Sequence, residues 1–152
     1  MTLGRAPSFA RRWIAISAAA FCSLTIACTI TQRVMPVPPD LQDEVCIIEN
    51  PAVRPGFVAE YQSALGARGY RHRMLPEDAR SSDCLITSTY IGRWSWDMAL
   101  YMSYAEIKVY NDGRLVGEAL YDSTHGGGRI FEKFIDAERK IQELVAELFP
   151  AR

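Results

Sequence analysis

Histidine, excess charge of one sign and long apolar segments are all scarce in this chain, and each shortage argues against a class of function. The 152 residues include only two histidines, His72 and His125, which do not have the spacing of a metal site. The 17 basic and 18 acidic side chains nearly balance, so the positive field of a nucleic-acid-binding protein is missing. We therefore expect no metal, no cofactor and no nucleic-acid partner.

The longest apolar run covers residues 13–30 and is interrupted by two serines and two threonines. A membrane-spanning helix needs roughly 20 mostly apolar residues. The run follows a stretch with Arg5, Arg11 and Arg12 but no acid, and the small residue Ala27 comes directly before Cys28. These features are typical of an export signal. An uncleaved membrane anchor is the alternative.

The segment Leu24–Cys28 resembles the lipobox of bacterial lipoproteins, with Thr25 at a position that usually holds leucine. The resemblance implies cleavage before Cys28, a diacylglycerol on its sulfur and an acyl chain such as palmitate on its amine. Several acyl chains together give stable anchoring. Because Thr29 is not the aspartate associated with inner-membrane retention, we expect the protein at the periplasmic face of the outer membrane.

Three regions follow from this interpretation. Residues 1–27 are the predicted signal peptide, and without its three arginines the chain has 14 basic and 18 acidic side chains. Residues 28–43 are expected to be the lipidated cysteine and a semi-rigid tether rich in proline, with Pro36, Pro38 and Pro39. Residues 44–150 suffice for one small domain.

Cys46 and Cys84 are the cysteines that remain besides Cys28 once the signal is removed. An even pair in the oxidising periplasm predicts a disulfide bond. Two buried free thiols that act as small apolar side chains are the alternative.

Hydrophobic patterning predicts an α+β domain in the order β-α-β-β-β-β-α, with a mostly antiparallel sheet and helices on one face. In the hairpin around Gly113, a type I turn with a bulge would place Leu115 on the core face with Ile107 and Val109. The expected strands are 44–49, 70–75, 85–96 and 100–110, and a last strand after Gly113 that includes Leu115 and Tyr121. One expected helix begins near Pro55 and ends at Gly69, and the other covers 130–149.

The domain also resembles a family of small uncharacterised bacterial envelope lipoproteins, through three motifs. These motifs are Val45–Pro51, Trp94–Asp97 with Tyr104–Ile107, and Asp112–Leu115. The resemblance spans most of the domain and implies no established activity.

An aromatic cluster is the best candidate for a binding site. Trp94 and Trp96 lie two residues apart, so in a strand both side chains point to one side. They form either part of the core or an exposed surface that would bind a protein partner or stack against cell-wall glycan. The candidate residues are Trp94, Trp96, Asp97, Tyr101 and Tyr104.

Signs of catalysis are weak, and we expect no enzyme. The glycines after His125 lack the Lys-Ser or Lys-Thr of a P-loop, so an ordinary crossover into the last helix is favoured over an anion site. His125 lies too close in sequence to Asp122 and Ser123 for the geometry of a catalytic triad. Acid and base carboxylates for glycan hydrolysis would have to come from Glu49, Asp97 and Glu106.

The sequence thus predicts a non-catalytic, lipid-anchored envelope lipoprotein whose domain binds a protein partner at the outer membrane. A glycan-binding module that uses the tryptophan cluster is the alternative, and a small hydrolase is a third hypothesis.

Overall fold

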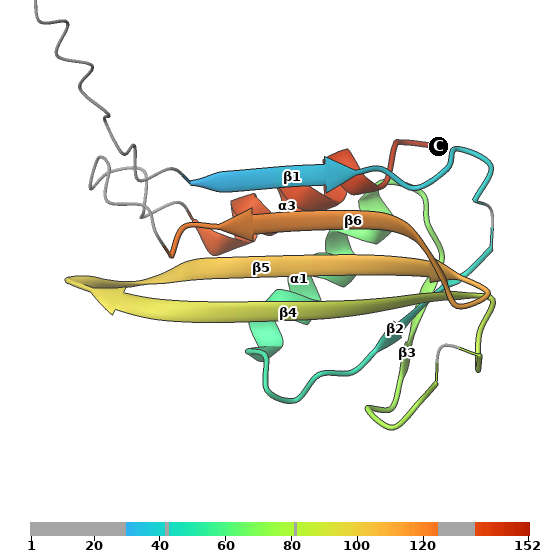
Figure 1. Cartoon of the computed structure of the whole chain (residues 1–152), viewed down its shortest axis with the longest axis horizontal. Coiled ribbons are helices and arrows are strands. Elements are labelled where there is room, and N and C mark those ends of the chain that lie inside the picture. The colour runs from blue at the N-terminus through green and yellow to red at the C-terminus, as the bar shows by residue number, and fades with distance from the viewer. Residues whose placement is uncertain (1–29, 42, 81, 125–135) are drawn as a thin grey trace, which may run out of the picture.

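The computed structural model describes residues 30–41, 43–80, 82–124 and 136–152, and these form one α+β domain with a six-stranded mixed sheet (Figure 1). The strand order is β1-β6-β5-β4-β2-β3. Strands β1, β6, β5 and β4 pair antiparallel, while β2 pairs parallel with both β4 and β3. The elements are β1 (Thr31–Met35), β2 (Val45–Ile48), α1 (Pro55–Ala67), β3 (His72–Leu75), β4 (Ile86–Asp97), β5 (Ala99–Asn111), β6 (Arg114–Asp122) and α3 (Ala137–Leu148). The predicted fold class is confirmed.

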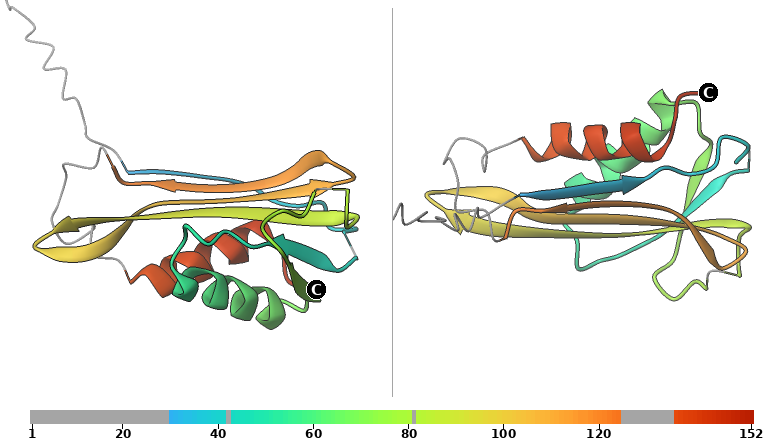
Figure 2. Two further views of the ribbon diagram at one scale, coloured as in Figure 1. Left: turned by 90° about the horizontal axis from the view of Figure 1, so that it is seen from below. Right: turned by 45° about the horizontal axis from the view of Figure 1, so that its top comes forward.

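Both helices pack on the same face of the sheet, as Figure 2 shows. Helix α1 begins at Pro55, because a backbone N–H at this position has no partner within the helix and proline lacks one. After the helix the chain turns at Gly69, which has a φ of 86°. Helix α3 begins after Asp136, whose side chain accepts a hydrogen bond from the backbone N–H of Glu138. The opposite face of the sheet carries no helix in the part of the chain that the structure describes, which an antiparallel sheet tolerates.

The core lies between the helices and the sheet. It includes Phe57 and Tyr61 from α1, Leu144 and Leu148 from α3, and alternate residues of the central strands, such as Ile107. The buried Tyr61 hydroxyl pairs with the Ser88 hydroxyl at 2.8 Å, so this polar group has a partner in the core.

The hairpin between β5 and β6 has a tighter turn than predicted. Asp112 and Gly113 both have positive φ, 48° and 74°, as a two-residue type I′ turn requires. An irregularity in the pairing then sets Val109 opposite Gly117, while Leu115 lies opposite Tyr110 and is 43% exposed. The prediction that Leu115 shares the core face was therefore wrong, because the turn type and the bulge shift the register.

The segment predicted as a tether contains part of the domain. Thr31–Met35 forms the edge strand β1 and pairs with β6, and Val37 and Leu41 after it are buried. The prolines at positions 36, 38 and 39 follow the strand, where they interrupt no sheet hydrogen bonds. A domain start at residue 44 was therefore too late.

The predicted disulfide is confirmed: Cys46 on β2 is bonded to Cys84, with 6.3 Å between the two Cα atoms. The bond ties β2 to the segment that leads into β4. The expected last helix is observed from Ala137, and the rest of that prediction, residues 130–135, lies outside the described residues. Cys28 and the predicted signal peptide lie outside them as well.

Candidate ligand-binding site

The two tryptophans of the predicted cluster lie on one side of β4 but in different environments. Trp94 is opposite Met102, and Trp96 is opposite Leu100, so both indoles point to the face that carries the helices. Trp94 is half-buried, whereas Trp96 is 75% exposed because it lies near the tip of the β4–β5 hairpin. The pair is thus neither one core layer nor one continuous exposed surface.

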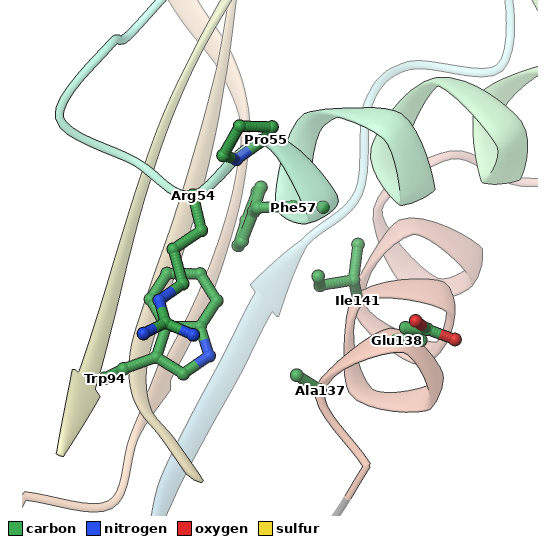
Figure 3. A pocket seen from close by; sticks show the side chains of 8 residues that line it. Arg54, Pro55, Phe57, Trp94, Ala137, Glu138 and Ile141 are labelled. Atoms are coloured by element: carbon green, nitrogen blue, oxygen red, sulfur yellow. The ribbon is translucent and has the colours of Figure 1, made fainter. Parts of the chain in front are cut away.

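Trp94 forms one wall of a pocket of about 440 Å³ at the N-terminal ends of both helices (Figure 3). A pocket of this size lies within the usual range for small-molecule sites. The lining residues are Arg54, Pro55, Gly56 and Phe57 from the start of α1, Trp94 from β4, and Ala137, Glu138 and Ile141 from α3.

Gly92 allows the indole of Trp94 to take its position. A Cβ atom at Gly92 would lie 2.9 Å from both the Phe57 ring and the Trp94 ring, a separation that real Cβ atoms do not show. With hydrogen in its place, Trp94 meets Phe57 edge to face, with 6.4 Å between the ring centroids. The wall of the pocket is therefore fixed to the core through Phe57.

Two charged side chains of opposite sign border the pocket. The Arg54 guanidinium lies 5.4 Å from the centroid of the Trp94 ring, and Glu138 extends from the first turn of α3. Both side chains are exposed, so neither bears a large desolvation penalty. An apolar wall next to one hydrogen-bond donor group and one acceptor group fits a polar ligand with an apolar face.

Tyr101 and Tyr104 face away from this pocket. Tyr101 is opposite Ser95 and Tyr104 is opposite Arg93, so both lie on the sheet face without helices. The Arg93 guanidinium lies 5.1 Å from the centroid of the Tyr104 ring, and the Tyr104 hydroxyl donates to Glu106 at 2.9 Å. The structure therefore divides the predicted cluster between two faces, because a bulge at Ser103 puts Tyr101 and Tyr104 on one side.

Charges on the helix-free face form a network around Lys108. Its ammonium group lies 2.9 Å from Glu106 and 3.6 Å from Glu118 on β6. The hydrogen bond with Glu106 raises the pKa of Lys108, which keeps the ammonium charged. Partial burial, together with the carboxylate of Glu106, raises the pKa of Tyr104. The network is therefore a set of satisfied surface charges rather than an activated group.

Two of the carboxylates considered for glycan hydrolysis, Glu106 and Asp97, lie far apart along the sheet. Glu106 is opposite Ile91, and Asp97 lies six residues further along β4, which corresponds to about 20 Å at the rise of a strand. Paired acid and base carboxylates in glycosidases are at most about 9.5 Å apart. Asp122 and Ser123 lie at the end of β6 and just after it, and His125 lies outside the described residues.

No group of His, Cys, Asp and Glu side chains among the described residues could hold a metal ion. Within the same ranges, no helix is long and apolar enough to cross a membrane.

Sequence reasoning missed Arg54, Phe57, Glu138 and Gly92. Arg54 and Phe57 lie on either side of Pro55 and Gly56, and these two residues indicated only the start of a helix. Glycine in the middle of a strand often marks a close approach, so Gly92 was the one available signal that a large side chain lies over β4 at that point.

Comparison with known proteins adds evidence on the fold. Neither protein-family profiles nor curated protein sequences match the chain. Two solved structures of the PelC dodecamer from Paraburkholderia phytofirmans are similar to it. One aligns with 16% identity and a TM-score of 0.54 over 78% of this chain and 98% of PelC. The other, a single-substitution variant, aligns with 18% identity and a TM-score of 0.56 over 82% and 100%. At this level of identity the likeness extends to the fold.

Proposed function

We propose that this protein is a non-catalytic, lipid-anchored envelope lipoprotein whose domain binds polysaccharide in the Trp94 pocket. The observation that carries the proposal is the half-buried indole of Trp94, which forms one wall of the pocket, with Arg54 over its ring and Glu138 on α3 across the pocket. Sugar rings have an apolar C–H face that stacks on an indole, and hydroxyl groups at the ring edge that pair with guanidinium and carboxylate groups.

Arg54 partly covers the indole, and a ligand would have to displace it. A cation–π contact at an exposed site is worth about 0.5–1 kcal/mol, which is small compared with the contacts that a bound sugar makes. The Arg54 side chain can therefore swing out at low cost and pair with the ligand. This is the role that the pocket geometry favours for it.

The proposed anchor is the acylated Cys28 at the periplasmic face of the outer membrane. The Cys46–Cys84 disulfide supports an oxidising compartment. Metabolic labelling with a fatty acid tests the anchor: the wild-type protein should carry the label, and Cys28→Ala should not. A labelled Cys28→Ala protein would remove Cys28 from the proposal.

Pocket variants test sugar binding in the purified full-length lipoprotein. Arg54→Ala and Glu138→Ala alter exposed side chains, so the fold should persist, and each should weaken binding of peptidoglycan fragments or envelope polysaccharide at least tenfold. Trp94→Phe should also weaken it, because the smaller ring leaves part of the wall open. Arg139→Ala, an exposed neighbour of Glu138, is the matched control. Equal binding by all four variants would refute the pocket as the site.

A protein partner is the second candidate, and the comparisons suggest that this partner is another copy of the chain. Both similar structures are described as dodecamers, and the alignments cover nearly all of PelC. Native mass spectrometry of the detergent-solubilised lipoprotein tests this candidate. A closed assembly of many subunits would support it, and a monomer at micromolar concentration would exclude it.

A further inference from the structure

The tip of the β4–β5 hairpin exposes an unusual amount of apolar surface. Trp96, Met98 and Leu100 are 75%, 85% and 45% exposed. Trp96 and Leu100 are opposite each other across the hairpin, and Met98 forms the turn between the strands. Large apolar side chains gathered at a protruding tip are typical of a contact surface.

Met98 also has an unusual backbone, with φ at 61°. The left-handed region is strained for a residue that carries a side chain, and glycine or asparagine is the usual occupant. Here a methionine occupies it and extends its side chain into solvent. Folding of the turn alone does not require a side chain of that kind, and a contact outside the domain would account for it.

The hairpin tip and the predicted lipid anchor lie at the same end of the domain. Thr31, at the start of β1, is opposite Asp122, which is in turn opposite Tyr104 on β5. Six residues separate Tyr104 from Met98, so the hairpin extends about 20 Å beyond this row. Figure 1 shows the hairpin projecting past the start of β1.

Chain length limits how far a lipid on Cys28 can lie from the start of β1. Three peptide units separate Cys28 from Thr31, and they span at most about 11 Å. An acyl chain on Cys28 would hold the start of β1 within this distance of the membrane surface, and the hairpin extends about 20 Å beyond the start of β1. The tip is therefore long enough to reach the lipid.

The small number of charged residues along the hairpin also fits contact with lipid. Between Trp94 and Ala105 the one residue that is charged at neutral pH is Asp97, and the charged residues Arg93 and Glu106 flank the stretch. Tyr101 lies within it as well. Tryptophan and tyrosine prefer the membrane–water interface, where the ring is in the apolar layer and the polar atom remains hydrated.

We infer that the tip formed by Trp96, Met98 and Leu100 inserts into the interfacial layer of the bilayer that holds the lipid of Cys28. The inference rests on the proposed lipid anchor. One flexible attachment point leaves the domain free to rotate, whereas a second contact sets its orientation. The Trp94 pocket would then be held at a defined height above the membrane.

Tryptophan fluorescence tests the insertion in the lipidated full-length protein, reconstituted in vesicles of phosphatidylethanolamine and phosphatidylglycerol. Trp13 precedes the predicted cleavage site, so Trp94→Phe leaves Trp96 as the reporter, and Trp96→Phe leaves Trp94 as the matched control. Lipid brominated near the top of its acyl chains should quench Trp96 emission at least twofold, and Trp94 emission much less. Trp96 emission that is unchanged by brominated lipid would overturn the inference, whether the tip is in water or covered by another protein chain.

A spin label gives a second measurement that does not depend on Trp94→Phe folding. A label at Met98→Cys should be more accessible to oxygen than to a water-soluble nickel complex, and a label at Leu115→Cys, an exposed leucine near the β5–β6 turn, should show the reverse. Equal nickel accessibility at both sites would contradict insertion. The intact mass reports acylation beforehand, so a missing lipid at Cys28 is distinguished from a tip that fails to insert.

Discussion

At the residue scale, two strand glycines make room for the large side chains that define this domain. Gly92 admits the Trp94 ring against Phe57. Gly117 admits Val37 and Leu148, whose atoms would lie 2.5 and 3.0 Å from a Cβ at that position. Interiors packed to this density do not accept an added carbon without a shift. Glycine is thus required at both positions by close contact rather than by backbone angle.

Gly117→Ala should lower the free energy of unfolding by about 1–3 kcal/mol, the usual cost of overpacking a core. Val37→Ala removes the nearest atom, so the double variant should lose less than the sum of the two single variants. Urea denaturation of the four proteins gives the coupling. If the losses of the two single variants simply add, the methyl group added at position 117 is accommodated without displacing Val37.

Predictability from sequence also differs between residues. Cys46 and Cys84 were paired correctly because their number and the expected compartment left few options. The division of the tryptophan and tyrosine cluster between two faces was not predictable, because a single bulge at Ser103 reverses the alternation after it. The pocket around Trp94 depends on contacts between α1, β4 and α3, which no local pattern reveals.

At the element scale, the buried side chain of Lys140 on α3 forms a hydrogen bond with the edge strand β1. The Lys140 ammonium donates to Glu143 at 2.7 Å and to Gln32 at 3.1 Å, and it lies 5.2 Å from the centroid of the Tyr121 ring. Gln32 donates in turn to Glu143 at 2.9 Å. These contacts explain why residues expected to form a tether instead form a strand: Gln32 and Val34 have partners on α3 and in the core.

The pH dependence of stability should reflect this cluster. The hydrogen bond from Lys140 lowers the pKa of Glu143, with a further contribution from Gln32. A carboxyl with a depressed folded-state pKa stabilises the fold above its unfolded-state pKa, and this stabilisation is lost as the pH falls through the folded-state value. Glu143→Gln should therefore weaken the acid dependence of urea midpoints below about pH 4.3, the ordinary glutamate pKa. Glu77→Gln, which alters an exposed side chain in the loop after β3, is the control. If the urea midpoints of Glu143→Gln and wild type fell equally as the pH is lowered, the assignment would be contradicted.

The disulfide links β2 to the segment before β4, across 38 residues of sequence. Closing a loop of this length stabilises the fold by about 4 kcal/mol in the chain-entropy estimate. The double variant Cys46→Ala, Cys84→Ala should lose a large part of that value in chemical denaturation. The wild-type protein should gain about 2 Da on reduction, since two thiols replace the bond. Retention of full stability would show that packing alone holds this end of the sheet.

At the scale of the whole molecule, the domain has two distinct faces and a projecting end. The helical face holds the core and the Trp94 pocket, the other face carries the charged network around Lys108, and the hairpin tip projects beyond β1. The α+β class and the helices on one face followed from hydrophobic periodicity. The mixed strand order and the edge position of β1 did not, since they depend on pairings between residues far apart in sequence.

The central claim is that Trp94 contacts a bound polysaccharide, and a fluorescence titration of Trp96→Phe tests it most directly. In that variant, after removal of the predicted signal peptide, Trp94 is the tryptophan that remains. Addition of envelope polysaccharide should shift or quench its emission in a saturable way, and Arg54→Ala in the same background should move saturation to at least tenfold higher concentration. A Trp94 emission spectrum that does not change up to millimolar sugar would contradict the claim.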